Sequence, residues 1–436
     1  MTAASLPELV SRFGACRILV VGDPILDEYV TGDCTRLSPE APIPVLRVRG
    51  TRSVLGGAAN TAANVAALGG HAVLVGVIGN DETGRRLAEL ATDRGITTAF
   101  VRHDRPSSRK LRALGGQQQL LRLDFEDDRP VSASAAEAAL EQVRLHLSDV
   151  SVLVVSDYSK GLVTVEFCQD IIRLAKRANV PVVIDPRPQH ARAYVGCDYL
   201  TPNWKEAQGL LGEIEGPPSR SAVRDVAGRL AAKFGANILL TLGSLGIRFF
   251  GRDGAPLFDE PARAREVFDV SGAGDTVVAT FALALAAGAD VPTSLRLANL
   301  AAGIVVAKVG TATVSRGELL AGPDGDGRLV DRRALGERVA QARESGRRVG
   351  AVTGVFDVVN ASTLDRLQSV RRQVDLLIVG LRVGLGDEPA RARVLLGLRD
   401  VDLVHMMDDQ AWFLSTLAPD AHIDESSVAT AARTPR

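Results

Sequence analysis

Aromatic residues are scarce in this chain of 436 residues, where Phe, Trp and Tyr together make up 4%. Because 46% of the residues are apolar all the same, we expect a core built from Val, Leu, Ile and Ala. Cysteine is also rare, and its four copies, at positions 16, 34, 168 and 197, form no Cys-x-x-Cys pair. This spacing argues against a zinc site or a disulfide framework and predicts reduced, buried thiols.

The chain has no excess of charge of either sign, since 51 Lys and Arg residues stand against 52 Asp and Glu residues. This balance argues against a nucleic-acid partner or a polybasic membrane anchor. The sequence has no run of about 18 apolar residues, the length that a membrane helix requires. Its first residues read as an amphipathic segment leading into a strand, not as a signal peptide. We therefore expect a cytoplasmic protein without a membrane partner.

Apolar runs typical of buried strands alternate with helix-like segments through the first three quarters of the chain. This alternation predicts an α/β fold with a central, mostly parallel sheet and helices on both faces. The expected strands lie at 17–23, 72–79, 152–157, 180–186, 199–203 and 237–246, and the expected helices at 56–69, 81–95 and 164–179. Ligands of such sheets bind beyond the carboxyl ends of the strands. Polar residues stand at four of these ends: Asp23, Asp157, Asp185 and Asn203.

Two segments interrupt the alternation, at about 36–54 and 108–125. They read as short extended pieces separated by turns, and we expect them to form a small antiparallel β lid that carries basic and amide groups over the sheet. Because an extended edge of this kind often pairs with a second copy, the lid also predicts a homodimer.

A second, smaller domain is expected after a segment rich in Gly and Asp at 321–329. We therefore assign residues 1–320 to the first domain and 321–347 to a linker and a charged helix. Residues 348–424 are assigned to a Rossmann-like α/β domain, and 425–436 to a tail.

The stretch "SGAGDT" at 271–276 reads as a glycine turn that opens a helix. Gly272, Ala273 and Gly274 leave backbone N–H groups unshielded at the helix start, where the helix dipole also favours an anion. Asp275 could take a proton from a hydroxyl while this cradle holds a phosphate, as phosphoryl transfer requires. The alternative is an ordinary acidic residue at the start of a helix.

Two further segments place polar groups near turns. Gly56, Gly57 and Asn60 in "GGAAN" could approach a polyol, or could simply let a helix pack closely on the sheet. Asn203 and Glu206 suit the water-rich shell of a Mg²⁺ ion beside nucleotide phosphates, with Glu206 acting through water. The alternative for this pair is a helix cap followed by a first-turn glutamate.

Together these motifs resemble those of the ribokinase (PfkB) family of carbohydrate kinases over roughly residues 15–318. The resemblance implies a ribokinase-like fold and a sugar kinase with Asp275 as base and Gly272 to Asp275 as anion hole. The cofactors it implies are ATP, Mg²⁺ and the monovalent cation that occurs near the anion hole in relatives. The implied nucleotide side consists of Asn203, Lys205, Glu206, Thr241, Gly243, Gly246 and Asn299. The implied sugar site includes Asp23, Asp27, Gly56, Gly57, Asn60, Asp157 and Asp185.

A narrower resemblance is to kinases of D-glycero-D-manno-heptose 7-phosphate, which phosphorylate the anomeric hydroxyl to give the 1,7-bisphosphate. It is carried by "GDPILDEYVTGDCTRLSPEAPIPVLRV", "SRKLRALGGQQQLLRLDFED", "VLVVSDYSKG" and "IDPRP". A sugar that already bears a phosphate requires cations at the end far from the base. The residues expected in this part of the pocket are Lys110, Arg112, Gln118, Lys160 and Arg187, with Arg122 nearby. Any one of these charges could instead be a solvated surface residue.

The chain departs from this narrower pattern at Arg187, where lysine is usual, and at Gly116, where a basic residue is common. Since arginine and lysine are not interchangeable at a close contact, a kinase for another phosphosugar or sugar stays open. A bifunctional kinase and adenylyltransferase and a non-catalytic sugar-binding scaffold are the further alternatives.

The segment "TGVFDVVNAST" at 353–363 resembles the nucleotidyltransferase motif T-N-G-x-F-D-x-x-H-x-G-H. Asn360 and Thr363 replace its two histidines, and Ser362 replaces a glycine. Because Asn and Thr cannot carry the positive charge that the histidines supply, we expect a degenerate domain without adenylyltransferase activity. Such a domain could support packing or dimer formation, sense a nucleotide, or bind a separate adenylyltransferase.

Overall fold

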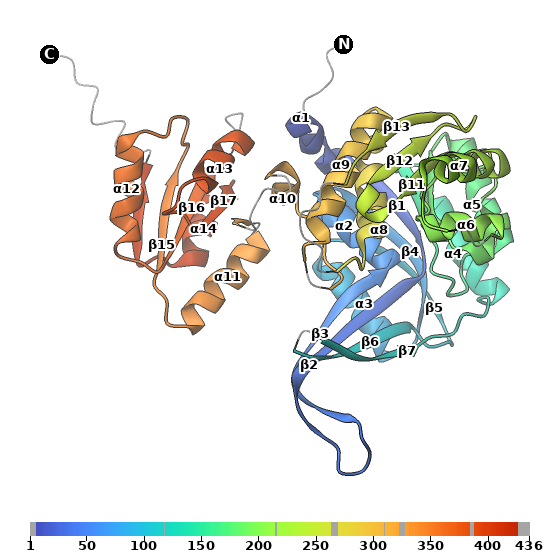
Figure 1. Ribbon diagram of the computed structural model, residues 1–436, viewed down its shortest axis with the longest axis horizontal. Helices are drawn as coiled ribbons and strands as arrows, with labels where there is room; N and C mark the ends of the chain where they lie inside the picture. Colours follow the sequence, from blue (N-terminus) through green and yellow to red (C-terminus); the bar gives the residue numbers. More distant parts are fainter. Residues whose placement is uncertain are drawn as a thin grey trace. The chain divides into compact units, whose positions relative to one another are not determined.

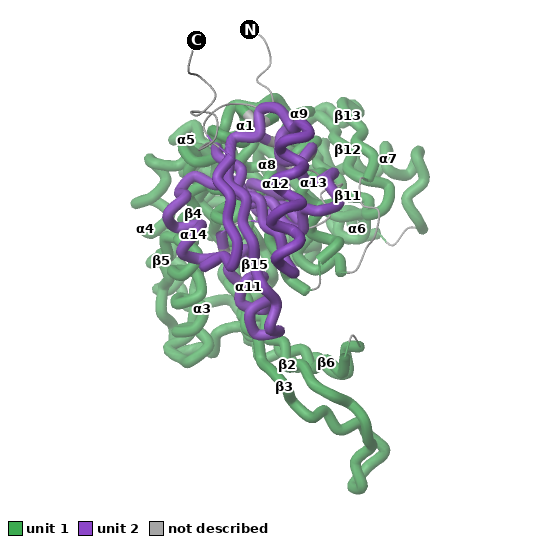
Figure 2. The backbone as a smooth tube through the Cα atoms, turned by 90° about the vertical axis from the view of Figure 1, so that its left-hand side faces the viewer, with its two compact units in different colours: residues 1–314 green, residues 315–436 purple. Residues whose placement is uncertain are grey.

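A computed structural model of the chain describes residues 6–116, 118–213, 216–262, 269–308, 310–321, 328–330, 332–383 and 388–425 (Figure 1). The chain divides into two compact units, residues 1–314 and 315–436 (Figure 2). Most of the expected linker, at 322–327, and the expected tail from residue 426 onward lie outside the described residues.

The first unit is built around a sheet whose described strands follow the order β13-β12-β11-β10-β9-β8-β1-β4-β5. Neighbours from β11 to β5 run parallel, whereas β12 and β13 are antiparallel additions at one edge. Their bounds are β1 (Arg17–Gly22), β4 (His71–Gly79), β5 (Thr97–His103), β8 (Val152–Ser156), β9 (Val182–Asp185), β10 (Tyr199–Leu200), β11 (Asn237–Thr241), β12 (Ile247–Phe250) and β13 (Pro256–Glu260). All six expected strands are confirmed. β10 is shorter than expected because Pro202 cannot donate to a ladder.

Helices cover both faces of this sheet, which explains why its strands are continuous apolar runs. Leu19 and Val21 of β1 pack with residues of α4, α5 and α7 on one face. Ile18 and Val20 alternate with them and point to the other face, where α2 and α8 contact the central strands. The helices are α1 (Leu6–Ser11), α2 (Ala58–Ala67), α3 (Glu82–Asp93), α4 (Ala133–Leu147), α5 (Val165–Ala178), α6 (Trp204–Leu211), α7 (Arg220–Phe234), α8 (Ala273–Ala286) and α9 (Val291–Val305). The three expected helices are present as α2, α3 and α5.

The small side chains of α2 and α8 explain how a core poor in aromatic residues is filled. Both helices bury several alanines, namely Ala58, Ala59, Ala62 and Ala63 in α2 and Ala279, Ala282 and Ala284 in α8. Because alanine has little volume, these helices can lie close to the sheet and to one another. Close packing of a helix, the alternative interpretation of "GGAAN", is therefore part of what this segment does.

The lid is a four-stranded sheet in the order β3-β2-β6-β7. Its strands are β2 (Pro24–Leu37), β3 (Pro44–Gly57), β6 (Ser108–Gly115) and β7 (Gln118–Phe125). The expected antiparallel arrangement is correct for two pairs, but the central pair β2 and β6 is parallel. The lid also begins before residue 36, because β2 starts only two residues after β1 and continues away from the central sheet (Figure 1).

The second unit contains a fully parallel sheet in the order β14-β17-β16-β15-β18. The strands are β14 (Leu329–Val330), β15 (Val349–Gly354), β16 (Leu376–Arg382), β17 (Leu403–Met407) and β18 (Ala421–Asp424), and the helices are α10 (Arg316–Ala321), α11 (Arg332–Glu344), α12 (Ala361–Arg371), α13 (Glu388–Leu396) and α14 (Gln410–Leu417). Two apolar clusters form its core. The unit begins before the boundary at 320 that the sequence suggests, since α10 contacts β14 and α13.

Within the described residues, no helix combines the length and the apolar character that a membrane crossing requires. The four cysteines are free thiols, and Cys16, Cys168 and Cys197 are buried as expected. Cys34 is exposed instead, because it lies on the part of β2 that extends into the lid.

Candidate active site

Asp275 lies in the first turn of α8, directly after a glycine turn. Only 3% of the residue is exposed. Three groups donate hydrogen bonds to its carboxylate: Asn60 Nδ2 lies 2.7 Å from Oδ2, and the hydroxyls of Thr61 and Tyr158 lie 2.9 and 3.0 Å from Oδ1. The start of α2 and the loop after β8 thus fix the orientation of this carboxylate.

The environment of Asp275 makes it a stronger base than an exposed aspartate. Burial raises the pKa of Asp275, because removal from water disfavours the ionised form. The hydrogen bonds from Asn60, Thr61 and Tyr158 lower the pKa, as does the positive charge of Arg187. The balance leaves a carboxylate that is oriented and more basic than usual, as the acceptor of an alcohol proton must be.

Gly272 forms the N-cap of α8 with φ at +79°, in the left-handed region. A side chain there would also lie 2.8 Å from Asn60 Nδ2 and 3.4 Å from the Thr311 methyl group. The position therefore requires glycine for its backbone and for its surroundings. By contrast, nothing lies within 4 Å of the place where a Cβ of Gly274 would be.

Only some of the backbone N–H groups expected in the anion hole are available to an anion. The Ala273 N–H donates to the Val270 carbonyl at 3.2 Å and closes the turn. The N–H groups of Gly274 and Asp275 belong to the first turn of α8, where helical geometry provides no acceptor. An anion at this helix start would therefore meet the amides that follow Ala273.

Asp27 on β2 joins the lid to this turn. Its Oδ2 accepts a hydrogen bond of 3.2 Å from the hydroxyl of Thr311, the residue that faces Gly272. Its Oδ1 pairs with Arg112 at 2.6 Å. A Cβ at Gly56 would lie 2.3 Å from Asp27 Oδ2, so this position also requires glycine. The structure thus brings Asp27, Gly56 and Arg112 together, close to the start of α8.

The two lysines expected to meet a sugar phosphate lie on either side of one carboxylate. Glu126 accepts from Lys110 at 3.1 Å and from Lys160 at 2.8 Å. Both lysine side chains are largely buried, with 19% and 14% exposed. Arg122 is about half exposed, and Gln118 is exposed at the start of β7. Lys110 and Lys160 are therefore brought together, whereas Arg122 and Gln118 lie toward solvent.

Asp23 holds the loop that follows β8. Its carboxylate accepts hydrogen bonds of 3.0 to 3.4 Å from the backbone N–H groups of Tyr158, Lys160 and Leu162. Burial raises the pKa of Asp23, and the nearby Asp157 raises it further. Gly57 is required beside it, because a Cβ there would lie 2.4 Å from the Asp23 carbonyl oxygen. Asp23 therefore positions the loop that supplies Tyr158.

Asp157 is fully buried and also engaged within the protein. Its Oδ2 accepts from the Tyr194 hydroxyl at 2.6 Å and lies 2.7 Å from His190 Nδ1. The hydrogen bond to Asp157 raises the pKa of His190. This buried network supports the end of β8 from the side of the segment Pro188–Tyr194.

Asn203 and Glu206 form a capping box at the start of α6. The Glu206 N–H donates to Asn203 Oδ1 and the Asn203 N–H donates to Glu206 Oε2, both at 2.9 Å. Glu206 also pairs with Arg187, whose guanidinium lies 4.7 Å from the centre of the Tyr158 ring. The interpretation of this pair as a helix cap is confirmed, and its role beside Mg²⁺ stays a prediction.

Asp185, at the end of β9, is a buried carboxylate close to Glu206, and such a pair bears on whether the site could hold a metal ion. Burial raises the pKa of Asp185 well above its usual range; Glu206 raises it further, and Arg187 opposes the effect. Two neighbouring carboxylates favour a cation, and a Mg²⁺ ion that arrives with a nucleotide needs only one or two of them. Within the described residues, no group of three or more His, Cys, Asp or Glu could hold a metal alone. Glu206 already accepts from the Asn203 N–H and pairs with Arg187, so it would meet a Mg²⁺ ion held by a nucleotide through water.

The residues expected on the nucleotide side come from neighbouring segments. Thr241 pairs with Asn203 across an isolated bridge between strand ends. Gly246 has φ at +86° and a Cβ there would lie 2.1 Å from the Glu260 carbonyl oxygen. Asn299 donates to the neighbouring Pro261 carbonyl at 2.7 Å. The turn at Gly243 and the exposed side chain of Lys205 complete this set.

Four residues at the site are missed by the sequence reasoning: Thr61, Glu126, Tyr158 and Thr311. Thr61 directly follows Asn60, and Tyr158 lies in "SDYSKG", so the motifs themselves offered a signal for both. Glu126 is a carboxylate at the end of a basic segment. Thr311 gives no local signal, because its contact with Asp27 spans 284 positions.

In the second unit, the positions that replace the two motif histidines make local contacts. Asn360 caps α12 by accepting the Thr363 N–H at 3.1 Å, and the Thr363 hydroxyl donates to Glu425 at 2.9 Å. A Cβ at Gly354 would lie 2.8 Å from Glu425 Oε2. A carboxylate therefore lies against two positions of the motif, and it would repel a phosphate brought to them.

Comparison with known proteins agrees with this geometry. A family model described as pfkB family carbohydrate kinase matches residues 18–316. The bifunctional protein HldE of Rhodospirillum rubrum is 40% identical over 440 residues, covering 95% of this chain and 88% of that protein. The bifunctional protein HldE of Azorhizobium caulinodans is 40% identical over 418 residues, covering 90% of this chain and 86% of that protein.

Two solved structures share the fold of the first unit. Arabidopsis thaliana ribokinase complexed with ribose and ATP has a TM-score of 0.56 and 24% identity, covering 70% of this chain and 97% of that chain. Escherichia coli phosphofructokinase-2 in complex with potassium has a TM-score of 0.58 and 21% identity, covering 69% and 95%.

The two glycines of the turn give a matched test of its geometry. Gly272→Ala should lower the free energy of unfolding by at least about 1–2 kcal/mol, the cost of a left-handed non-glycine residue, with the contact to Asn60 added. Gly274→Ala, in open helical space, should be neutral or stabilising by up to about 1 kcal/mol. Urea unfolding followed by Trp204 fluorescence, in a Trp412→Phe background, measures both. Equal effects of the two substitutions would contradict the turn geometry.

Proposed function

Because the chain belongs to the pfkB family of carbohydrate kinases, we propose that it transfers the γ-phosphoryl group of ATP to the anomeric hydroxyl of D-glycero-D-manno-heptose 7-phosphate. The product is the 1,7-bisphosphate. The observation that carries the proposal is the buried Asp275 carboxylate, held by three donors beside a glycine turn at a helix start. The resemblance of the lid and loop segments to heptose 7-phosphate kinases supports the choice of sugar.

In the proposed reaction, the anomeric oxygen attacks the γ-phosphorus while the bond from that phosphorus to the β–γ bridging oxygen breaks. The hydroxyl proton passes to Asp275, and ADP leaves with the bridging oxygen. Asn60, Thr61 and Tyr158 keep the base oriented during this step. The amides at the start of α8 would face the transferred group and stabilise its charge. Mg²⁺ held with the nucleotide near Asp185 and Glu206 would neutralise charge on the phosphates.

Charge complementarity supports a substrate that already bears a phosphate. Lys110 and Lys160 share Glu126, and Arg112 pairs with Asp27, so three cations lie in the lid and the adjoining loop. The sugar phosphate would replace Glu126 as the partner of the lysines. An unphosphorylated sugar would offer these lysines no anion.

We infer that the second unit does not catalyse adenylyl transfer. The loss of both histidines from the motif and the position of Glu425 against Thr363 and Gly354 support this inference. Its well-packed sheet suits a structural role. The exposed apolar residues of the lid support a homodimer in which the lids pair: Leu37, Ile43, Val48, Leu121, Leu123 and Phe125.

Asp275→Asn should lower turnover by about 10²–10⁴-fold, the usual contribution of a general base, because an amide cannot accept the proton. Folding and ATP binding should be kept, because the amide has the shape of the carboxylate and its oxygen still accepts from the hydroxyls of Thr61 and Tyr158. Only the hydrogen bond from Asn60 is lost. ADP release measured at saturating substrates checks this. Asp290→Asn, at the exposed N-cap of α9, is the control and should retain full activity. An active Asp275→Asn variant would remove Asp275 from the mechanism.

Tyr158→Phe should move the acidic limb of the pH–rate profile to higher pH. The Tyr158 hydroxyl lowers the pKa of Asp275, so its loss raises that pKa further, and the ionised base then appears only at higher pH. A hydrogen bond to a charged group contributes about 1.5–3 kcal/mol, so the shift should be roughly 1–2 pH units. Tyr199→Phe, whose ring packs on Phe281, is the control. A Tyr158→Phe profile that coincides with wild type, or moves to lower pH, refutes the role given to this hydroxyl.

Restoring the motif histidines with Asn360→His and Thr363→His should not produce adenylyl transfer, because Glu425 would still lie against Gly354 and would pair with a histidine at 363. The check is incubation with ATP and the heptose 1-phosphate, with ADP-heptose and pyrophosphate as readouts. ADP-heptose formed by the wild-type chain would overturn the inference that this unit is inactive.

A further inference from the structure

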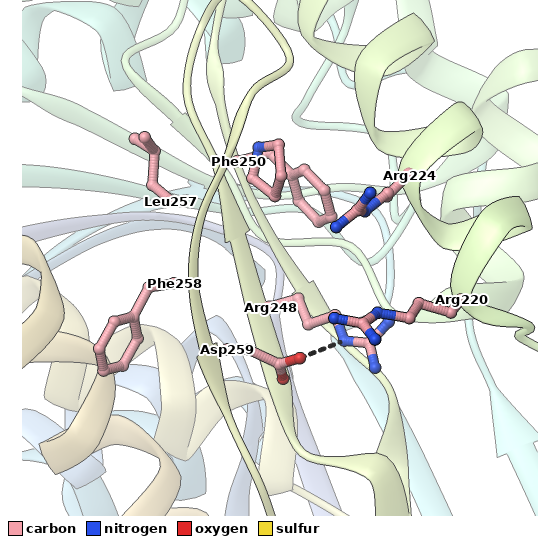
Figure 3. A pocket seen from close by; sticks show the side chains of 8 residues that line it. Arg220, Arg224, Arg248, Phe250, Leu257, Phe258 and Asp259 are labelled. Atoms are coloured by element: carbon pink, nitrogen blue, oxygen red, sulfur yellow. Dashed lines mark ion pairs between the residues drawn. The ribbon is translucent and has the colours of Figure 1, made fainter.

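A cavity of about 260 Å³ lies between α7 and the antiparallel edge strands β12 and β13 (Figure 3). It shares no lining residue with the candidate active site. Three arginines line it, Arg220 and Arg224 from α7 and Arg248 from β12, together with the carboxylate of Asp259. Phe250 and Pro256 supply apolar surface beside the arginines, whereas the side chains of Leu257 and Phe258 point away from them (Figure 3).

The charges of this cavity are unbalanced. Arg248 and Asp259 face each other across the β12–β13 ladder, with Nε and Oδ2 3.1 Å apart. Arg220 and Arg224 have no carboxylate partner within the described part of the chain. Counting the described residues alone, two positive charges thus stand without a carboxylate beside this cavity.

The positions of Arg220 and Arg224 are also unfavourable for the helix itself. Arg220 is the first residue of α7, which has no acidic residue in its first turn. The helix dipole favours anions, not cations, at this end, and like charges four residues apart repel each other. An anion in the cavity would relieve both effects.

From this geometry we infer that the cavity is a binding site for a phosphate group. Guanidinium groups are suited to phosphate because their donors match its oxygens in pairs. The cavity is smaller than the roughly 300–1,000 Å³ of sites for drug-sized ligands, which favours inorganic phosphate or a small phosphate ester. The site is independent of the proposed kinase reaction.

Calorimetric titration of the full chain with inorganic phosphate tests the proposal, in buffer free of other multivalent anions and at constant ionic strength. Arg220→Gln combined with Arg224→Gln should weaken binding by about 10-fold or more, since two charge-assisted contacts are lost. Arg229→Gln, on the same helix but paired with Glu213 and Asp225, should bind as wild type does. A parallel titration with ribose 5-phosphate shows whether the cavity prefers inorganic phosphate or a phosphate ester. For either anion, the site is assigned to this cavity only if the double arginine variant binds it more weakly than wild type.

Asp259→Asn keeps the test decisive if the double variant fails to fold. If the cavity binds phosphate, this substitution should tighten phosphate binding, because it removes a carboxylate that repels the anion and pairs with Arg248. If Asp259 and Arg248 form only a structural ion pair, phosphate binding should stay unchanged or weaken. The proposal is overturned if wild type does not bind phosphate, or if its affinity is the same in the double arginine variant. Unchanged or weaker binding by Asp259→Asn also overturns it.

Discussion

The hydrogen bonds that hold the buried carboxylate of Asp275 are the constraint on which the rest of the first unit depends. A buried carboxylate is stable only with donors around it, and here they come from the start of α2 and the loop after β8. That loop is held by Asp23 through three backbone N–H groups. Because β1 and β8 are neighbouring parallel strands, Asp23 and this loop lie at the same edge of the sheet. The start of α2 reaches them from the lid, since β3 leads directly into this helix.

The cations of the candidate active site are paired with acidic residues of the protein itself. Arg112 pairs with Asp27, the two lysines share Glu126, and Arg187 pairs with Glu206. Such pairing stabilises buried charges, and it means that an anionic substrate competes with a carboxylate for each cation. The second unit has a different arrangement, since the carboxylate of Glu425 lies against Thr363 and no cation is shown beside these two described residues.

Much of the fold could be predicted from the sequence, because buried parallel strands are continuous apolar runs and their order along the chain is visible. The position of Asp275 at a helix start also follows from "SGAGDT", whereas its burial does not. The parallel pairing of β2 with β6 did not follow, since pairing between distant strands leaves no local signal. For the same reason the sequence could not show that Asn60 donates to Asp275, 215 positions away, or that Thr311 links Asp27 to the turn.

The most direct test of the central claim is a ³¹P NMR assay of the position of the new phosphate. The protein is incubated with Mg²⁺ and ATP and with D-glycero-D-manno-heptose 7-phosphate, in parallel with fructose 6-phosphate and ribose. We predict a new anomeric phosphate on the heptose, with no ADP-heptose following. Transfer to another sugar but not to the heptose would contradict the proposed substrate, and no transfer to any of the three would contradict the proposed reaction.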